Sequence, residues 1–199
     1  MPHSKPQIQS LFKDTPLLRS RDLEKTGIKR IELSRYVAAG DLKRLKRGFY
    51  CLPDYRQNEH GDLAIVAKQV DGAVICLLSA LRYHELTTQA PAEIWIAIDR
   101  KARLPRLGFP NLKVLRFGKS AIGYGVETAR IEGVPVRITT IEKTIVDCFK
   151  YRSKVGLDTA LEALKDAQRR NLLDQNKLWY YSKIDRVTNV IRPYLEVLA

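Results

Sequence analysis

Basic side chains are concentrated in one short stretch near the start of the chain. Between positions 29 and 47 there are seven basic residues and two acidic ones, a formal charge of +7 − 2 = +5. Positive charge at this density favours binding to the phosphates of a nucleic acid. The candidate DNA-contacting residues are Lys29, Arg30, Ser34, Arg35, Lys43, Arg44, Lys46 and Arg47.

A second group of charges lies in the C-terminal part of the chain. Lys143, Asp147 and Lys150 are three or four residues apart, which places them on neighbouring turns of one helix. Together with Arg152 they are predicted to form a charged recognition surface on this part of the chain. Such a surface is a candidate for a second contact with nucleic acid or phosphate.

One further set of side chains could support catalysis. Glu93, Asp99 and Lys101 combine carboxylates with a lysine, as in some magnesium-dependent nucleases. A nuclease or another phosphate-processing enzyme is therefore one alternative interpretation. The spacing is nonspecific and no Pro-Asp pair precedes it, so an acid–base pair at a strand end is the favoured interpretation.

Other chemistry is not indicated by the sequence. His3, His60 and His84 are too widely spaced for a zinc site. Ser79 lacks the flanking glycines of a serine nucleophile elbow, and no glycine-rich phosphate loop is present. We therefore expect no catalytic residues, no metal and no cofactor.

The cysteines and the apolar segments indicate the compartment. Cys51, Cys76 and Cys148 are odd in number and far apart, which fits a reduced cytoplasm and argues against a disulfide framework. The first 20 residues do not resemble a signal peptide, and no apolar run approaches the ~18 residues of a membrane span. A cytoplasmic protein without membrane contact is expected.

The N-terminal basic residues need a helix and a β-ribbon to present them. A helix over residues 31–39 is predicted, with an apolar stripe of Ile31, Tyr36 and Val37 and a left-handed cap at Gly40. A basic ribbon follows and turns at Gly48. Two shorter helices are predicted before it, over residues 7–13 and from a cap at Ser20 to Gly27. This order predicts a winged helix-turn-helix domain over residues 1–55.

The remainder, residues 62–199, is predicted to be a separate α+β domain. Residues 53–61 are polar and rich in turn formers, and they form the expected boundary. A small, mainly antiparallel sheet is expected from strands over residues 93–99, 112–117, 126–131 and 134–139. A helical C-terminal part follows, opened by a capping box at residues 139–142 and bent or broken at Pro193.

The order of these motifs resembles the antitoxin of the AbiE type IV toxin–antitoxin systems over nearly the whole chain. In the N-terminal part the resemblance rests on Gly27, Ile28, Leu33, Gly40, Leu42, Leu45 and residues 47–50. Further on it rests on residues 76–81, 84–86, 91, 93–97, 142–144, 147–152 and 192–195.

The resemblance implies a non-enzymatic bacterial protein with two activities. Its winged domain is expected to bind inverted repeats in promoter DNA and to repress its own operon. Its C-terminal domain is expected to counteract a nucleotidyltransferase toxin without a stable complex. Besides the enzyme, a protein-interaction module whose basic surface meets an acidic partner remains a second alternative.

Overall fold

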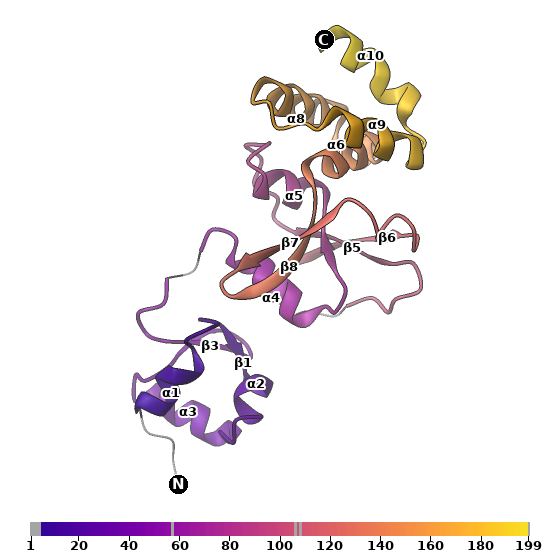
Figure 1. The fold of residues 1–199 in the computed structure, drawn as a ribbon. Helices are drawn as coiled ribbons and strands as arrows, with labels where there is room; N and C mark the ends of the chain where they lie inside the picture. The colour runs from indigo at the N-terminus through magenta and orange to yellow at the C-terminus, as the bar shows by residue number, and fades with distance from the viewer. Residues whose placement is uncertain (1–4, 57, 106, 108, 199) are drawn as a thin grey trace. The chain divides into compact units, whose positions relative to one another are not determined.

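The computed structural model describes residues 5–56, 58–105, 107 and 109–198, and the chain divides into two compact units (Figure 1). Unit 1 comprises Met1–Ala64 with the turn Arg130–Val134, and unit 2 comprises Ile65–Ala129 with Pro135–Ala199. Each unit is described separately below.

Unit 1 combines short helices with a small antiparallel sheet. Its elements are α1 (Lys5–Leu11), β1 (Leu18–Arg19), α2 (Ser20–Glu24), α3 (Arg30–Ala38), β2 (Lys43–Lys46) and β3 (Phe49–Cys51). The strand order is β1-β3-β2, so that β3 lies between the strand that precedes α2 and the strand that follows α3. The core of this unit consists of Ile8, Phe12, Leu23, Ile28, Leu33, Tyr36, Leu42 and Tyr50.

Two glycines end the helices of unit 1 and set the course of the chain. Gly40 has a φ of 75°, its N–H donates to Val37 O at 3.1 Å, and Asp41 N donates to Tyr36 O at 2.9 Å. These are the paired bonds of a Schellman motif, and they confirm the left-handed cap predicted at Gly40. Gly27, with a φ of 94°, ends α2 in the same way. Five residues, 25–29, join α2 to α3.

Two local predictions in unit 1 were wrong. Arg19, not Ser20, is the N-cap residue of α2. Its backbone N–H donates to Asp22 Oδ2 at 3.2 Å. Ile31 does not belong to the apolar stripe of α3, because its side chain is 65% exposed. Ile31 and Leu33 are two residues apart and point to nearly opposite sides of a helix, so only one of them can join the core.

Unit 2 is built on a five-stranded mixed sheet. After α4 (Gly61–Gln69) come β4 (Val74–Ile75), α5 (Leu77–Tyr83), β5 (Ile94–Asp99), β6 (Leu112–Phe117), β7 (Val126–Ile131) and β8 (Val134–Thr139). The strand order is β6-β5-β4-β8-β7. Strand β4 pairs antiparallel with β5 but parallel with β8, and β5 pairs parallel with β6. The α+β class is confirmed, whereas the mainly antiparallel sheet is corrected to a mixed one.

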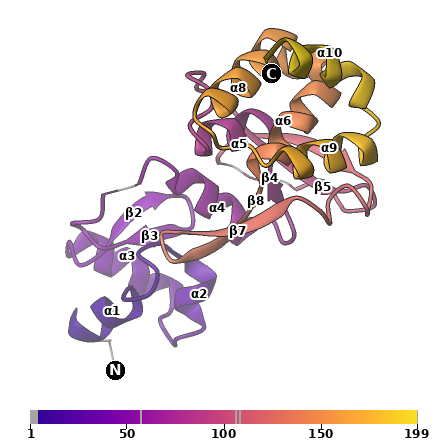
Figure 2. The same ribbon diagram turned by 45° about the horizontal axis from the view of Figure 1, so that its top comes forward.

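The chain becomes helical after the sheet, as predicted. The helices are α6 (Ile141–Lys150), α7 (Arg152–Val155), α8 (Leu157–Arg169), α9 (Gln175–Ile184) and α10 (Thr188–Leu198). In Figures 1 and 2, α6, α8, α9 and α10 gather on one side of the sheet. Trp95 and Ala97 of β5 pack into the same core as Phe149 of α6 and Leu164 of α8.

Two helix details of unit 2 differ from the predictions. Thr140, not Thr139, caps α6, because its side-chain oxygen accepts from Lys143 N at 3.4 Å. Helix α10 is not broken at Pro193, which lies inside it. Pro193 is exposed, so its ring lies away from the core, and only part of the helix follows it. None of the described helices is long and apolar enough to span a bilayer.

Candidate nucleic-acid interface and a buried charge network

Helix α3 presents the first four predicted contact residues on its exposed surface. Leu33 and Tyr36 are buried against the core of unit 1, and this orientation leaves Lys29, Arg30, Ser34 and Arg35 in solvent. Arg30 Nε lies 3.5 Å from Glu24 Oε1, and 82% of the Arg30 side chain is exposed. An ion pair this exposed contributes little stability, so Arg30 can exchange Glu24 for a phosphate at small cost.

The hairpin of β2 and β3 presents the other four predicted contact residues. Lys43, Arg44, Lys46 and Arg47 are all exposed, while Phe49, Tyr50 and Cys51 of the partner strand are buried. The register shifts between Arg44 and Lys46, and this bulge lets basic residues follow one another along an exposed ribbon. Ser20 N donates to Gly48 O at 2.9 Å and so ties the hairpin turn to the start of α2.

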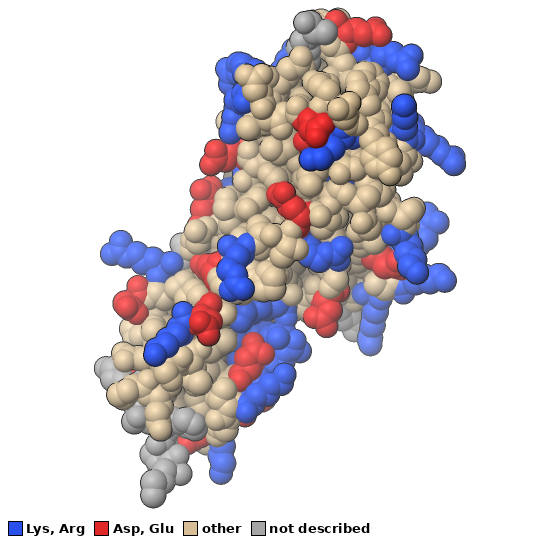
Figure 3. Space-filling view, in the orientation of Figure 1, with Lys and Arg blue, Asp and Glu red and all other residues tan. Residues whose placement is uncertain are grey.

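One acid near these basic residues, Glu32, accepts a hydrogen bond from the backbone. Glu32 Oε2 accepts from Lys29 N at 2.7 Å and thereby caps the first turn of α3. Lys and Arg side chains stand out from the surface of the N-terminal unit in Figure 3. All eight predicted contact residues are exposed, and the long cationic side chains of the seven basic ones are suited to phosphate and base-edge contacts.

The predicted charged surface in unit 2 is instead a largely buried network. Lys143 and Asp147 are buried and form an ion pair one helical turn apart. Lys143 Nζ also lies 3.1 Å from Asp185 Oδ2, and Lys150 pairs with the other Asp185 oxygen. The prediction of a recognition surface is therefore wrong for Lys143 and Asp147. All of residues 142–149 are buried, so the charged side of α6 also lies inside the fold, which helical spacing alone does not indicate.

The other two members of the predicted set are not buried, since Lys150 is partly exposed and Arg152 is exposed. The Lys150 side chain is 33% exposed, and Arg152 donates from Nη1 to Phe149 O at 3.0 Å. These two stay candidates for an external contact, whereas Lys143 and Asp147 act inside the fold.

Tyr124 and Asp185 complete the network, and nothing in the sequence around α6 indicated them. Tyr124 Oη donates to Asp185 Oδ2 at 2.5 Å, and its ring lies 4.9 Å from Lys143 Nζ. Gly125 permits this approach, because a Cβ built there would lie 2.7 Å from Lys143 Cβ. Burial and the bond to Asp185 raise the pKa of Tyr124, so the phenol stays protonated.

The two carboxylates of the network titrate differently. Burial raises the pKa of Asp147 to about 6, against the opposing effect of Lys143, and its Oδ2 atom is buried without a hydrogen-bond partner among the described residues. Burial also acts on Asp185, but Lys143, Lys150 and Tyr124 together outweigh it and lower its pKa. Asp185 thus keeps its charge, while Asp147 is the carboxylate of the network that is more easily protonated.

The residues proposed for a nuclease are not brought together. Glu93 precedes β5 and Asp99 ends it, so they are separated by the length of the strand, roughly 20 Å. Asp99 Oδ1 accepts from Lys101 N at 2.8 Å, which is a local turn at the strand end. Among the described residues, no three His, Cys, Asp or Glu side chains are close enough to share a metal ion.

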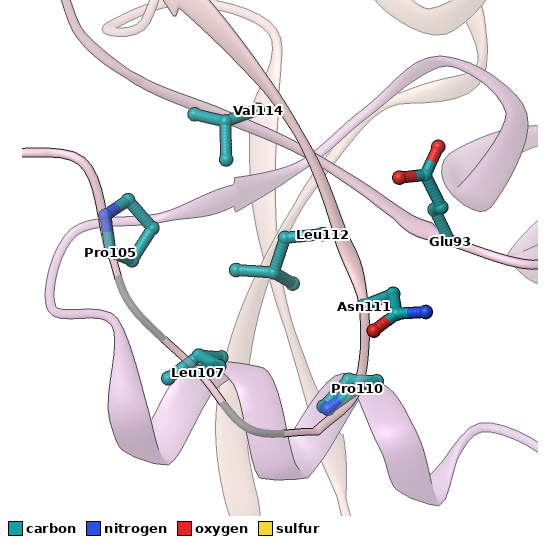
Figure 4. Close-up of a pocket in the computed structure, with 7 residues that line it drawn as sticks. All are labelled: Glu93, Pro105, Leu107, Pro110, Asn111, Leu112 and Val114. Carbon is teal, nitrogen blue, oxygen red and sulfur yellow. The ribbon is translucent and has the colours of Figure 1, made fainter.

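A pocket of about 380 Å³ lies beside the start of β6. Figure 4 shows Pro105, Leu107 and Leu112 together, with Glu93 and Asn111 to one side. Apolar residues dominate the part of the lining that the structure describes, and Glu93 is the single titratable residue in that part. These described residues offer no arrangement for acid–base or metal chemistry.

Comparison with known proteins bears on unit 1. Residues 6–53 match the model of a family described as transcriptional regulator, AbiEi antitoxin. No curated protein matches the chain significantly. The matched range begins in α1 and ends just after β3, so it contains both exposed basic elements. Residues 6–53 are therefore a domain of the AbiEi transcriptional regulator and antitoxin family.

Proposed function

We propose that residues 1–55 are a winged helix-turn-helix domain that binds promoter DNA and represses the operon encoding this protein. The observation that carries this proposal is the order α1-β1-α2-α3-β2-β3 with the sheet order β1-β3-β2, within the range matched by the regulator family. In this arrangement α3 is the recognition helix and the β2–β3 hairpin is the wing.

The exposed residues have separate roles in this proposal. Arg30, Ser34 and Arg35 contact base edges or phosphates from α3, and Lys29 supports them at its N-terminus. Lys43, Arg44, Lys46 and Arg47 contact the backbone or the minor groove from the wing. Their exposure leaves them available for these contacts. Two recognition helices placed on inverted repeats would then read two half-sites.

For residues 62–199 we propose the antitoxin activity. This domain counteracts a nucleotidyltransferase toxin without forming a stable complex, and it acts without catalysis. The support is the resemblance of the whole chain to the AbiE antitoxins, together with the family match of the N-terminal domain. A cytoplasmic location follows from both proposed activities.

The test is fluorescence anisotropy with the promoter DNA of the protein's own operon. Full-length protein is titrated over a salt series beside scrambled DNA of the same length. If five of the basic residues neutralise phosphates, log K falls with log salt at a slope of about −4 to −5. A slope near zero, or equal affinity for both DNAs, would contradict the proposal.

A matched pair of variants tests whether the phosphate contacts come from the wing. Replacing Lys43, Arg44, Lys46 and Arg47 with glutamine should make the slope less steep by roughly 3 to 4. The control replaces Lys154, Lys165, Lys177 and Lys183 with glutamine, which removes the same charge from exposed positions of unit 2. The control should reduce the slope by less. Equal effects would mean that the positive charge acts generically.

A further inference from the structure

The recognition helix exposes one large apolar side chain. Ile31 is 65% exposed in the second position of α3. Full burial of a side chain of this size stabilises a protein by about 1.5–3 kcal/mol, and the fold obtains little of this from Ile31. The exposed isoleucine therefore needs an explanation outside the core of unit 1.

Helical geometry places Ile31 near the middle of the outward face. At about 100° per residue, Ser34, Arg35 and Ala38 all lie within roughly 60° of Ile31 around the helix axis. The buried residues Leu33 and Tyr36 lie on the opposite side. All three neighbours of Ile31 on the outward face are exposed as well. Ile31 is therefore the apolar centre of a face bordered by a hydroxyl and a guanidinium.

The chemistry of this face fits the major groove of DNA. The basic residues Lys29, Arg30 and Arg35 attract the phosphate backbone, but Ile31 contributes nothing to that attraction. Within the major groove, the one apolar group on a base-pair edge is the C5-methyl of thymine. A branched aliphatic side chain on the outward face can shield this methyl from water, as neither Ser34 nor Arg35 can.

We propose that Ile31 is a specificity residue that packs against the C5-methyl group of a thymine in the operator. The proposal rests on the DNA-binding function proposed above and deepens it, because it names a base that the recognition helix reads. Ile31 thus prefers thymine over cytosine, which lacks the methyl, at one position of each half-site.

The experiment removes the methyl group without changing base pairing. Single thymines in the promoter DNA are replaced in turn by deoxyuridine, and affinities are measured for full-length wild type, Ile31→Ala and Val197→Ala. Val197 is 85% exposed on α10 and serves as a matched truncation of an exposed branched side chain. Alanine has the highest helix propensity, so Ile31→Ala keeps α3 folded.

The expected result is one sensitive thymine in each half-site. Deoxyuridine there should weaken wild-type and Val197→Ala binding about fourfold, the effect of leaving one methyl group unburied. Ile31→Ala should bind the thymine operator more weakly and lose nothing further with deoxyuridine. This loss of sensitivity separates a base contact from a general weakening of the helix.

Three other results would overturn the inference, and they have two different meanings. If the wild type selects its promoter over scrambled DNA but tolerates deoxyuridine everywhere, the DNA-binding function stands and the role of Ile31 fails. The same holds if Ile31→Ala keeps the wild-type sensitivity. If the wild type does not select its promoter at all, both proposals fail together.

Discussion

At the scale of single residues, Asp147 should make the stability of unit 2 depend on pH. Its pKa is raised from 3.8 to about 6, so between these values the folded chain holds a proton that the unfolded chain has released. Its contribution is therefore fully present below about pH 4 and is lost as the pH rises through 6. A shift of about two units corresponds to a decrease of roughly 3 kcal/mol in the free energy of unfolding.

Asp147→Asn should remove this dependence between pH 4 and 6.5, because asparagine does not titrate. Urea unfolding followed by tryptophan fluorescence is the measurement, since both tryptophans, Trp95 and Trp179, belong to unit 2. Asp185 has a lowered pKa and titrates below this pH range, so it does not obscure the result. The exposed Asp158→Asn is the control and should keep the wild-type slope. An unchanged slope in Asp147→Asn would refute the assignment.

Lys143 should be the most costly residue of the network to replace. Lys143→Met leaves Asp147 and Asp185 buried without their shared cation, and removing one partner of a buried pair costs about 3–5 kcal/mol. Lys154→Met, at an exposed position of α7, should change stability by less than about 0.5 kcal/mol. The same urea assay compares the two. A similar small effect for both would mean that the network does not hold unit 2 together.

The sequence indicated which charges share a helix but not where they lie in the fold. Lys143 and Asp147 were correctly placed one turn apart, which follows from helical spacing alone. Their partners Asp185 and Tyr124 lie outside α6 and far from it along the chain, and no local pattern connects them. The prediction that Ile31 joins the apolar stripe was wrong for a related reason, because it ignored that Leu33 lies on the opposite side of the helix.

At the scale of elements, the end of α3 is the part that a single substitution should test most directly. Gly40→Ala forces an alanine into the left-handed conformation at a φ of 75°, while open space surrounds the new Cβ. The expected cost to unit 1 is about 1–2 kcal/mol, and it comes from the backbone rather than from a clash. Gly118→Ala is the matched control, with equal open space and no left-handed φ.

Far-UV circular dichroism during thermal unfolding, together with promoter affinity, follows this change. Gly40→Ala should lower the midpoint of the transition that belongs to unit 1 and weaken DNA binding, since α3 and the wing both adjoin this turn. Gly118→Ala should leave both unchanged. If the two variants behave alike, the Schellman motif at Gly40 is not needed to position the wing.

Most elements were predictable because their patterns are local. The strands β5 to β8 and helices α6 and α8 follow alternation or helical spacing that lies within one segment. Strand β4 was missed, because its two residues, Val74 and Ile75, lie in a continuous apolar run without alternation. The sheet is mixed because β5 pairs parallel with β6 and β4 pairs parallel with β8, and neither pairing is visible in a local pattern.

At the scale of the whole molecule, the two proposed activities should be separable by substitution. The quadruple glutamine variant of Lys43, Arg44, Lys46 and Arg47 changes only exposed residues of unit 1. It should lose repression of a reporter driven by the protein's own promoter and still rescue cells that express the toxin. Lys143→Met weakens the network that lies within unit 2, so it should rescue poorly while it retains promoter binding.

Both variants are compared with wild type at equal protein abundance, because a destabilised protein can lose rescue simply by degradation. Lys154→Met is the control for Lys143→Met in the rescue assay. If the wing variant also failed to rescue at normal abundance, DNA binding and toxin neutralisation would share one surface. The opposite losses in the two variants would instead assign repression to the exposed charges of unit 1 and neutralisation to the fold of unit 2. The buried lysine would then serve the antitoxin by holding that fold together.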